Sequence, residues 1–217
     1  MDIFDYFAWL TMPIWGPFVF LLQLFSDPNE ETIKIAILGG SKGCGKSELW
    51  NQLRGTKNPG KPTEQTRIES FVIGKKQNGV EVTVETTKDL GGGRSFVSSY
   101  EEIVNSDGVF VYFLIDLRTL ERDKREIRGR LRKIGAIIEQ HEYKNCGINI
   151  VGTFYDKYRG LLALKDKEDA KNEILQVLTD GHKTIKGIKK EKMKIRIINT
   201  TNKQDIDEIR NEILKTI

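Results

Sequence analysis

A glycine-rich segment near the start of the chain restricts the fold more than any other feature of the sequence. It reads Gly40-Ser41-Lys42-Gly43-Cys44-Gly45-Lys46-Ser47. An apolar run, 32–38, precedes it, and a segment with the composition of a helix, 46–54, follows it. Glycine lets the backbone turn its N–H groups inward, and the following helix adds the positive end of its dipole. The pattern G-x-x-x-x-G-K-S between a strand and a helix therefore predicts a loop that binds phosphate groups.

The candidate residues of this site fall into a phosphate-binding set and a metal-binding set. We expect Lys46 to reach the β- and γ-phosphates of a nucleotide and the Ser47 hydroxyl to hold Mg²⁺. The predicted phosphate-binding residues are Gly40, Lys42, Gly43, Cys44, Gly45, Lys46, Ser47 and Gly92. The predicted Mg²⁺ ligands are Ser47, Thr66 and Asp89.

A second glycine-rich segment, Asp89-Leu90-Gly91-Gly92-Gly93, follows a predicted strand that ends at Thr86. An acid in this place binds Mg²⁺ through water, and a glycine N–H beside it senses the γ-phosphate, because glycine allows close approach of the backbone. The polar segment 57–67 lies between the two glycine-rich segments. Thr66 or Thr63 within it is expected to add a hydroxyl to Mg²⁺ while the γ-phosphate is present.

Strand and helix patterns alternate over the remaining chain. Two runs, 68–75 and 80–86, flank Gln77-Asn78-Gly79 and predict a hairpin. Further strands are predicted at 108–115, 148–152 and 195–199, and further helices at 167–178, at 204–214 and around the apolar stripe Ile127, Leu131, Ile134 and Ile138. Six strands and about five helices in this order predict an α/β fold of the P-loop NTPase class over 32–217, with a six-stranded, mostly parallel sheet flanked by helices.

The order of the phosphate loop, the threonine loop, the hairpin and Asp-x-x-Gly resembles the Ras-like small GTPases. The run Asp89-Leu90-Gly91-Gly92 is similar to the Arf branch. The Gln65-Thr66 context, the long hairpin and the hydrophobic N-terminus are similar to the beta subunit of the signal recognition particle receptor. This resemblance implies GTP and GDP as ligands, Mg²⁺ as cofactor and regulatory proteins as partners.

The family's guanine-binding motif, Asn-Lys-x-Asp, corresponds here to Thr153-Phe154-Tyr155-Asp156. Asp156 is expected to accept the N1 and N2 protons of guanine, Thr153 to stand for the asparagine, and Phe154 to pack on the base as the lysine stem does. The second base-binding loop is expected at 199–202, with Thr201 as its contact residue. The predicted guanine-binding residues are thus Thr153, Asp156 and Thr201.

The position of the family's water-orienting glutamine is occupied by Gly93, which has no side chain. The catalytic residues are therefore unknown, and intrinsic hydrolysis is expected to be slow or to depend on a partner. Two roles stay open: a membrane-associated nucleotide-dependent switch, and a GTP-binding scaffold or anchor subunit that does not hydrolyse. A P-loop kinase or ATPase is less favoured, because no arginine-rich lid is evident and Asp156 favours guanine.

The N-terminal segment, 1–26, has a different character. From Tyr6 to Ser26 it holds 21 residues without a formal charge, a helix of about 31 Å. Pro13, Gly16 and Pro17 interrupt this run. We expect a hydrophobic helical segment that contacts a membrane or a hydrophobic protein through 3–25, a linker at 27–31, and a location on the cytoplasmic face of a membrane.

Two basic segments, 122–133 and 183–196, each hold seven Lys or Arg residues. They are candidates for contact with anionic lipid or an acidic partner, or they are solvated surface. Nucleic acid is not favoured, because no aromatic residues for base stacking are interleaved. The two cysteines, 44 and 146, form no disulfide framework.

Overall fold

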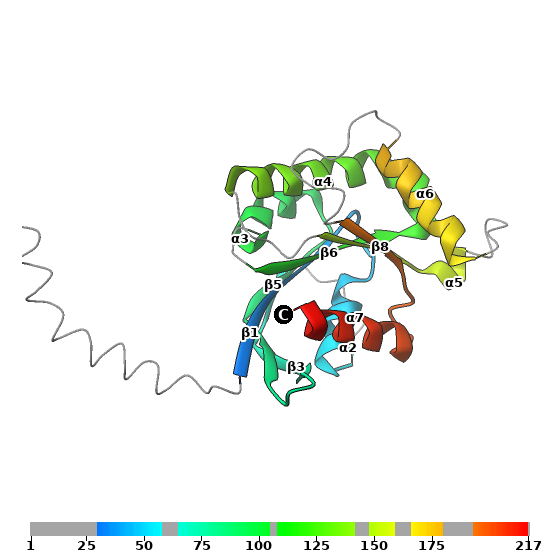
Figure 1. Ribbon diagram of the computed structural model, residues 1–217. Coiled ribbons are helices and arrows are strands. Elements are labelled where there is room, and N and C mark those ends of the chain that lie inside the picture. Colours follow the sequence, from blue (N-terminus) through cyan, green and yellow to red (C-terminus); the bar gives the residue numbers. More distant parts are fainter. Residues whose placement is uncertain are drawn as a thin grey trace, which may run out of the picture.

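The computed structural model describes residues 30–57, 65–104, 108–141, 148–158, 166–179 and 193–216 (Figure 1). Four strands follow one another between 65 and 90, strands and helices otherwise mostly alternate, and short 3₁₀ turns lie at Arg94–Ser99 and Leu117–Thr119. The strands are β1 (Glu30–Gly39), β2 (Gln65–Ile68), β3 (Phe71–Lys75), β4 (Glu81–Val84), β5 (Thr87–Leu90), β6 (Val109–Asp116), β7 (Ile148–Thr153) and β8 (Met193–Ile197). The helices are α2 (Lys46–Arg54), α3 (Tyr100–Val104), α4 (Leu120–His141), α5 (Tyr155–Tyr158), α6 (Lys167–Thr179) and α7 (Lys203–Thr216).

The main sheet has six strands in the order β3-β4-β1-β6-β7-β8, so the predicted architecture is confirmed. In this spatial order, the neighbours β4, β1, β6, β7 and β8 all pair in parallel. The β3–β4 hairpin is antiparallel. The strand β1 pairs with β4 through Glu30–Ile33 and with β6 through Lys34–Gly39. Its carboxyl end therefore lies beside β6, where the glycine-rich segment begins.

A second, two-stranded sheet was not predicted. The expected strand 68–75 is divided at Glu69-Ser70, and its first residue belongs to β2. The strand β2 pairs antiparallel with β5, so Asp89 lies within a strand and not in a loop after one. Local patterning could not show this pairing, because the paired residues are 19 to 25 positions apart in the sequence.

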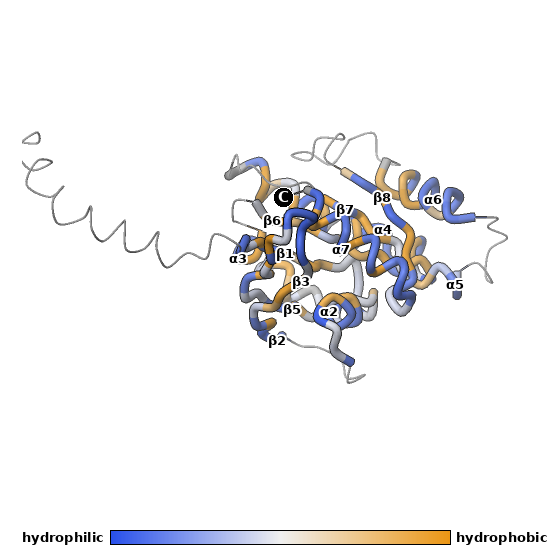
Figure 2. Tube along the Cα trace, turned by 60° about the horizontal axis from the view of Figure 1, so that its bottom comes forward, coloured by the Kyte–Doolittle hydropathy of each residue, from blue (hydrophilic) through white to orange (hydrophobic). Residues whose placement is uncertain are grey.

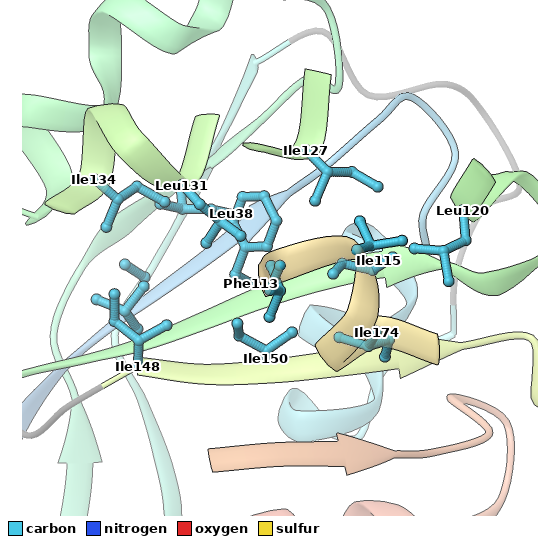
Figure 3. Packing of buried hydrophobic residues seen from close by; sticks show 14 of the residues in the cluster. Leu38, Phe113, Ile115, Leu120, Ile127, Leu131, Ile134, Ile148, Ile150 and Ile174 are labelled. Atoms are coloured by element: carbon cyan, nitrogen blue, oxygen red, sulfur yellow. The ribbon is translucent and has the colours of Figure 1, made fainter. Parts of the chain in front are cut away.

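Helices cover both faces of the main sheet, with α3, α4 and α6 on one face and α2 and α7 on the other (Figure 1). Alternate residues of β6 belong to the two cores, so that Phe113 packs toward α4 and Tyr112 toward α2 and α7. The predicted stripe on α4 packs on the sheet through Ile127, Leu131 and Ile134 (Figure 3), and Ile138 is half-buried. Burial on both faces explains why the second half of β1, from Ile35 on, and most of β6 and β7 are apolar.

The helices show the polar and apolar sides that this layering requires, as α6 does in Figure 2. Residues 1–29 lie outside the described part, so the predictions for 3–25 and most of the linker stay predictions. The strand β1 begins at Glu30, two residues before the predicted strand. No helix within the described ranges is long and apolar enough to cross a membrane.

Candidate functional site

The glycine-rich loop lies at the carboxyl ends of β1 and β6. The Gly40 N–H donates to the Leu114 carbonyl at 2.8 Å and ties the start of the loop to β6. Gly43 and Gly45 have φ of 79° and 92°, in the left-handed region that disfavours side chains. The loop thus has the backbone geometry that the sequence predicts, and α2 begins directly after it at Lys46.

The structure brings two of the predicted metal ligands together. The Ser47 hydroxyl donates to Asp89 Oδ2 at 2.6 Å, although 42 positions separate the two residues. Asp89 is 2% exposed, and Lys46 beside Ser47 is 7% exposed. The Ser47 hydroxyl and the Asp89 carboxylate therefore form a buried polar contact between the start of α2 and β5.

These donors fit Mg²⁺. Mg²⁺ prefers oxygen ligands and is often held by one or two protein groups, waters and phosphate oxygens. Ser47 and Asp89 offer such oxygens, and no group of three or more His, Cys, Asp or Glu side chains placed to hold a metal occurs in the described part of the chain. The third predicted ligand, Thr66, is exposed and lies opposite Asp89 in the β2–β5 ladder, so both residues belong to one face of that ladder. Thr63 lies outside the described residues.

Gly92 lies against the glycine-rich loop. A Cβ atom at this position would overlap Lys42 Cα and lie 2.9 Å from both Lys42 N and Ser41 O. Only glycine allows this approach, which explains the residue type at a predicted phosphate-sensing position. Lys42 itself is exposed at the outer side of the loop, and Cys44 is fully buried.

On the opposite side of the loop, Thr153 ends β7. Its buried hydroxyl lies 3.0 Å from the Cys44 carbonyl and 3.2 Å from the Ile115 carbonyl, and its one proton serves one of them at a time. Thr153 thereby links the predicted base-binding segment to the phosphate loop. The link between the two segments is therefore made by a hydroxyl in place of the asparagine amide of the motif.

Phe154 follows with φ of 58°, the only left-handed non-glycine residue among the described residues. The Arg118 guanidinium lies 3.8 Å from the centre of the Phe154 ring, within the range of a cation–π contact. Buried Asp116 holds this guanidinium with bonds of 2.9 and 2.7 Å. The hydrogen bond with Asp116 raises the pKa of Arg118, and the charge of Asp156 acts in the same direction.

Arg118 and its partner Asp116 were not predicted as site residues. The signal that could have found them is an aspartate at the carboxyl end of a buried strand, followed two positions later by arginine. Asp156 lies exposed in the first turn of α5. The stack of Arg118 on Phe154 and the nearby carboxylate make a flat surface with an acceptor beside it.

The loop 199–202 also reaches the phosphate loop, but through a neighbour of the predicted residue. Gly45 lies close to both threonines. A Cβ atom added to Gly45 would be 3.6 Å from the side chain of buried Thr200 and 3.9 Å from the side chain of Thr153. Thr201 is exposed, and its hydroxyl and N–H both donate to Asn199 Oδ1, at 2.7 and 3.0 Å. Thr200 is therefore an additional residue of this site.

The basic segment 122–133 forms most of α4. Arg122 and Lys124 pair with Asp123 and Glu121, whereas Arg125, Arg132 and Lys133 are exposed. Arg130 is only 3% exposed and does not belong to the surface that was predicted from this segment. Of the segment 183–196, the structure describes only 193–196.

No protein-family model matches the chain, and no curated protein matches it. The chain is similar to a solved structure described as the structure of the mammalian SRP receptor, with a TM-score of 0.59. The two share 15% identity, and the match covers 86% of this chain and 100% of that chain. This likeness establishes a shared fold, and the predicted resemblance is confirmed at that level.

Proposed function

We propose that the chain binds guanine nucleotide with Mg²⁺ and acts as a nucleotide-dependent switch whose own hydrolysis is slow. The observation that carries this proposal is the 2.6 Å contact between Ser47 and Asp89 under the glycine-rich loop. Both residues come from motifs that bind Mg²⁺ in the Ras-like arrangement, and Gly92 lies against the same loop.

The loop N–H groups and Lys46 bind the phosphates in this proposal. Lys46 is nearly buried, so its charge acts with little screening by water. Mg²⁺, when bound, offsets charge on the phosphate oxygens, and Ser47 and Asp89 hold it. Thr66 is proposed as a further ligand in the triphosphate state.

Guanine preference rests on the opposite side of the loop. Asp156 offers a carboxylate to the N1 and N2 protons of the base, and the Phe154–Arg118 pair offers a flat surface for stacking. Thr153 and Thr200 hold these segments against the phosphate loop. In the Asn-Lys-x-Asp motif, the asparagine corresponds to the tie to the phosphate loop, the lysine stem to the flat surface and the aspartate to the acceptor for the base.

Slow hydrolysis follows from Gly93. It begins the 3₁₀ turn Arg94–Ser99 and offers no side chain to orient a water molecule. We expect turnover of about 10⁻³ s⁻¹ or less, near that of unaided Ras. A GTP-binding scaffold subunit that does not hydrolyse is the second candidate, and the same residue favours it.

Membrane association at the cytoplasmic face is part of the proposal and is supported by the uncharged run from Tyr6 to Ser26. The exposed cations Arg125, Arg132 and Lys133 are a candidate contact with anionic headgroups or an acidic partner. Flotation of the full-length chain with neutral vesicles and with vesicles containing phosphatidylserine tests both contacts. A chain that stays unbound to both kinds of vesicle contradicts membrane association.

Calorimetric titration of the full-length chain with GDP, GTP and ATP in Mg²⁺ tests the nucleotide. We expect guanine nucleotides to bind more tightly than ATP, and Asp156→Asn to reduce this preference about 30-fold, the effect of about 2 kcal/mol in charge-assisted hydrogen bonds. Asp207→Asn is the matched control, because Asp207 pairs with Arg210 on the surface of α7. Equal or tighter binding of ATP to the unmodified chain would contradict the guanine assignment.

A further inference from the structure

Arg130 is the one buried arginine side chain among the described residues, and it lies within the apolar stripe of α4. It follows Ile127 by three positions and precedes Ile134 by four, so the helical period places it on the face that Ile127 and Ile134 pack on the sheet. Glu126, one turn earlier, forms an ion pair with its guanidinium. A charged group in this position requires partners within the core.

The partners are two glycine carbonyls from separate parts of the site. Arg130 Nη1 donates to the Gly39 carbonyl and Nη2 to the Gly92 carbonyl, both at 2.8 Å. Gly39 is the last residue of β1, directly before the phosphate loop, and Gly92 is the predicted phosphate-sensing residue. One planar guanidinium thus joins the two glycine-rich segments.

Tyr100 of α3 supports this arrangement. Its hydroxyl lies 3.3 Å from the Gly39 carbonyl and accepts a bond from Arg130 Nη1, also at 3.3 Å. Burial raises the pKa of Tyr100, while Arg130 acts in the opposite direction. The hydroxyl therefore stays protonated and donates to Gly39.

We propose that Arg130 is a positioning residue that holds the segment Gly91–Gly93 closed against the phosphate loop in both nucleotide states. In a Ras-like switch, the γ-phosphate orders this segment, and its release follows hydrolysis. Here α4 supplies donors from the protein itself, and the close approach of Gly92 to Lys42 shows where the segment is held. The inference rests on the proposed function, since it concerns the response of the same site to GDP and GTP.

The consequence is weak discrimination between the two nucleotides by this segment, so the proposed switch would depend on the other segment expected to respond to the γ-phosphate, the one that carries Thr66. A ligand shifts a conformational equilibrium only by its differential affinity for the two states. A buried, charge-assisted hydrogen bond favours the closed state by about 10- to 100-fold, so less of the equilibrium remains for the γ-phosphate to shift. Gly93, which offers no catalytic side chain, is consistent with a segment that does not have to respond to hydrolysis.

The test is hydrogen exchange of the amides in 91–99, measured on the full-length chain with GDP and with a non-hydrolysable GTP analogue. We expect similar protection in the two states for the unmodified chain. In Arg130→Met, we expect protection to fall at least 10-fold with GDP and to be retained with the GTP analogue. The ratio of GTP to GDP affinity, measured by calorimetry, should rise by about the same factor.

Arg128→Met is the matched control, because Arg128 lies on the same helix and donates to the Val177 carbonyl, away from the glycine-rich segments. It is expected to change stability without a nucleotide-dependent change in exchange of 91–99. If Arg130→Met does not fold, Arg130→Lys keeps the charge but cannot hold both carbonyls through one planar group, and an intermediate loss of protection with GDP is expected.

The outcomes separate this inference from the proposed function. Absence of nucleotide binding to the unmodified chain overturns the proposed function. Binding with protection of 91–99 only in the triphosphate state overturns the role of Arg130 and leaves the proposed function standing. Equal effects of Arg130→Met and Arg128→Met on hydrogen exchange would show that Arg130 only stabilises the fold. This result also overturns the inference.

Discussion

The proposed phosphate side and the proposed base side of the candidate site resemble the Ras-like pattern to different degrees. On the phosphate side, Ser47 and Asp89 are the residue types expected of a Ras-like loop, and they are in contact at 2.6 Å. On the base side, Thr153 and Phe154 replace the expected asparagine and lysine. The Thr153 hydroxyl nevertheless links this segment to the phosphate loop at Cys44.

The difference follows from the groups that each side uses. Phosphates are bound mainly by backbone N–H groups, so the sequence must place glycine where φ is positive, as at Gly43 and Gly45. A base is bound by side chains, and more than one side chain can supply a hydroxyl, a flat surface or a carboxylate. Phe154 shows that the exchange has a cost, because a left-handed conformation at a non-glycine residue is unfavourable by about 1–2 kcal/mol.

The largest expected effect sharpens this comparison on the phosphate side. Asp89→Asn removes the carboxylate charge next to Ser47, so under the proposed function Mg²⁺ would lose a ligand. We expect nucleotide affinity in Mg²⁺ to fall about 30-fold, which corresponds to about 2 kcal/mol. Affinity in EDTA should hardly change, and fluorescent-nucleotide binding with and without Mg²⁺ measures both.

Asp207→Asn is again the control, since its side chain is 42% exposed and pairs with Arg210 of the same helix. It should leave the Mg²⁺ dependence as it is. A similar loss of affinity in EDTA and in Mg²⁺ for Asp89→Asn would show that the residue supports the loop without binding the metal.

The backbone of the glycine-rich loop was predictable because its information is local. Eight consecutive residues, a strand before them and a helix after them specify the loop, and the glycines mark its unusual backbone angles. The main sheet was predictable for the same reason, since apolar strands alternate with helices. The β2–β5 pairing was not predictable, because neither the hydrophobic periodicity nor the composition of the two segments indicates that they contact each other.

The base side was predicted only in part. The motif predicts Asp156 and Thr153 from their place in the sequence, whereas Arg118 and Thr200 lie here only through contacts with residues far away in the sequence. On the phosphate side the same holds for Arg130, which contacts Gly39 and Gly92. Arg130 did leave a signal, because a charged residue interrupts the helix face that Ile127, Leu131 and Ile134 define. The segment 122–133 predicts a basic surface, but Arg130 belongs to the core.

An effect of intermediate size tests whether the Thr153 hydroxyl holds the base side against the phosphate loop. Thr153→Val keeps the shape of a buried side chain but removes the donor to the Cys44 carbonyl. We expect the free energy of unfolding to fall by about 1–2 kcal/mol, since a buried carbonyl loses its partner. Urea unfolding measures this, and nucleotide affinity should fall with it because the phosphate loop loses a tie.

Thr83→Val in β4 is the matched control, as Thr83 is half-buried in a strand and its hydroxyl makes no hydrogen bond within the described residues. It should change stability by less than about 0.5 kcal/mol. Equal stability of the Thr153 and Thr83 variants would break the comparison, since the base side would then be held to the loop by packing alone.

The smallest expected effect concerns Asp123, which joins α4 to the phosphate side. A hydrogen bond from Arg122 lowers the pKa of Asp123, burial opposes it, and hydrogen bonds from Thr119 and Ser41 lower it further. A lowered pKa in the folded state adds stability above the unfolded value of about 3.9, and this stability is lost as pH falls through the folded value. We expect Asp123→Asn to unfold about 0.5–1 kcal/mol more easily at pH 7 and to match the unmodified chain at the acidic end of a urea-unfolding series.

Salt separates the two sources of this effect. Arg122 is 74% exposed, so its contribution is screened at high ionic strength, whereas Asp123 is only 14% exposed and its hydroxyl donors are neutral. In about 1 M NaCl, where the screening length falls to about 3 Å, we expect part of the difference to persist if Ser41 and Thr119 hold the carboxylate. If the stability difference between the two chains disappears completely in salt, the surface ion pair with Arg122 accounts for the whole effect. Ser41 would then bind the phosphate loop to α4 less firmly than Thr153 binds the loop to the base side.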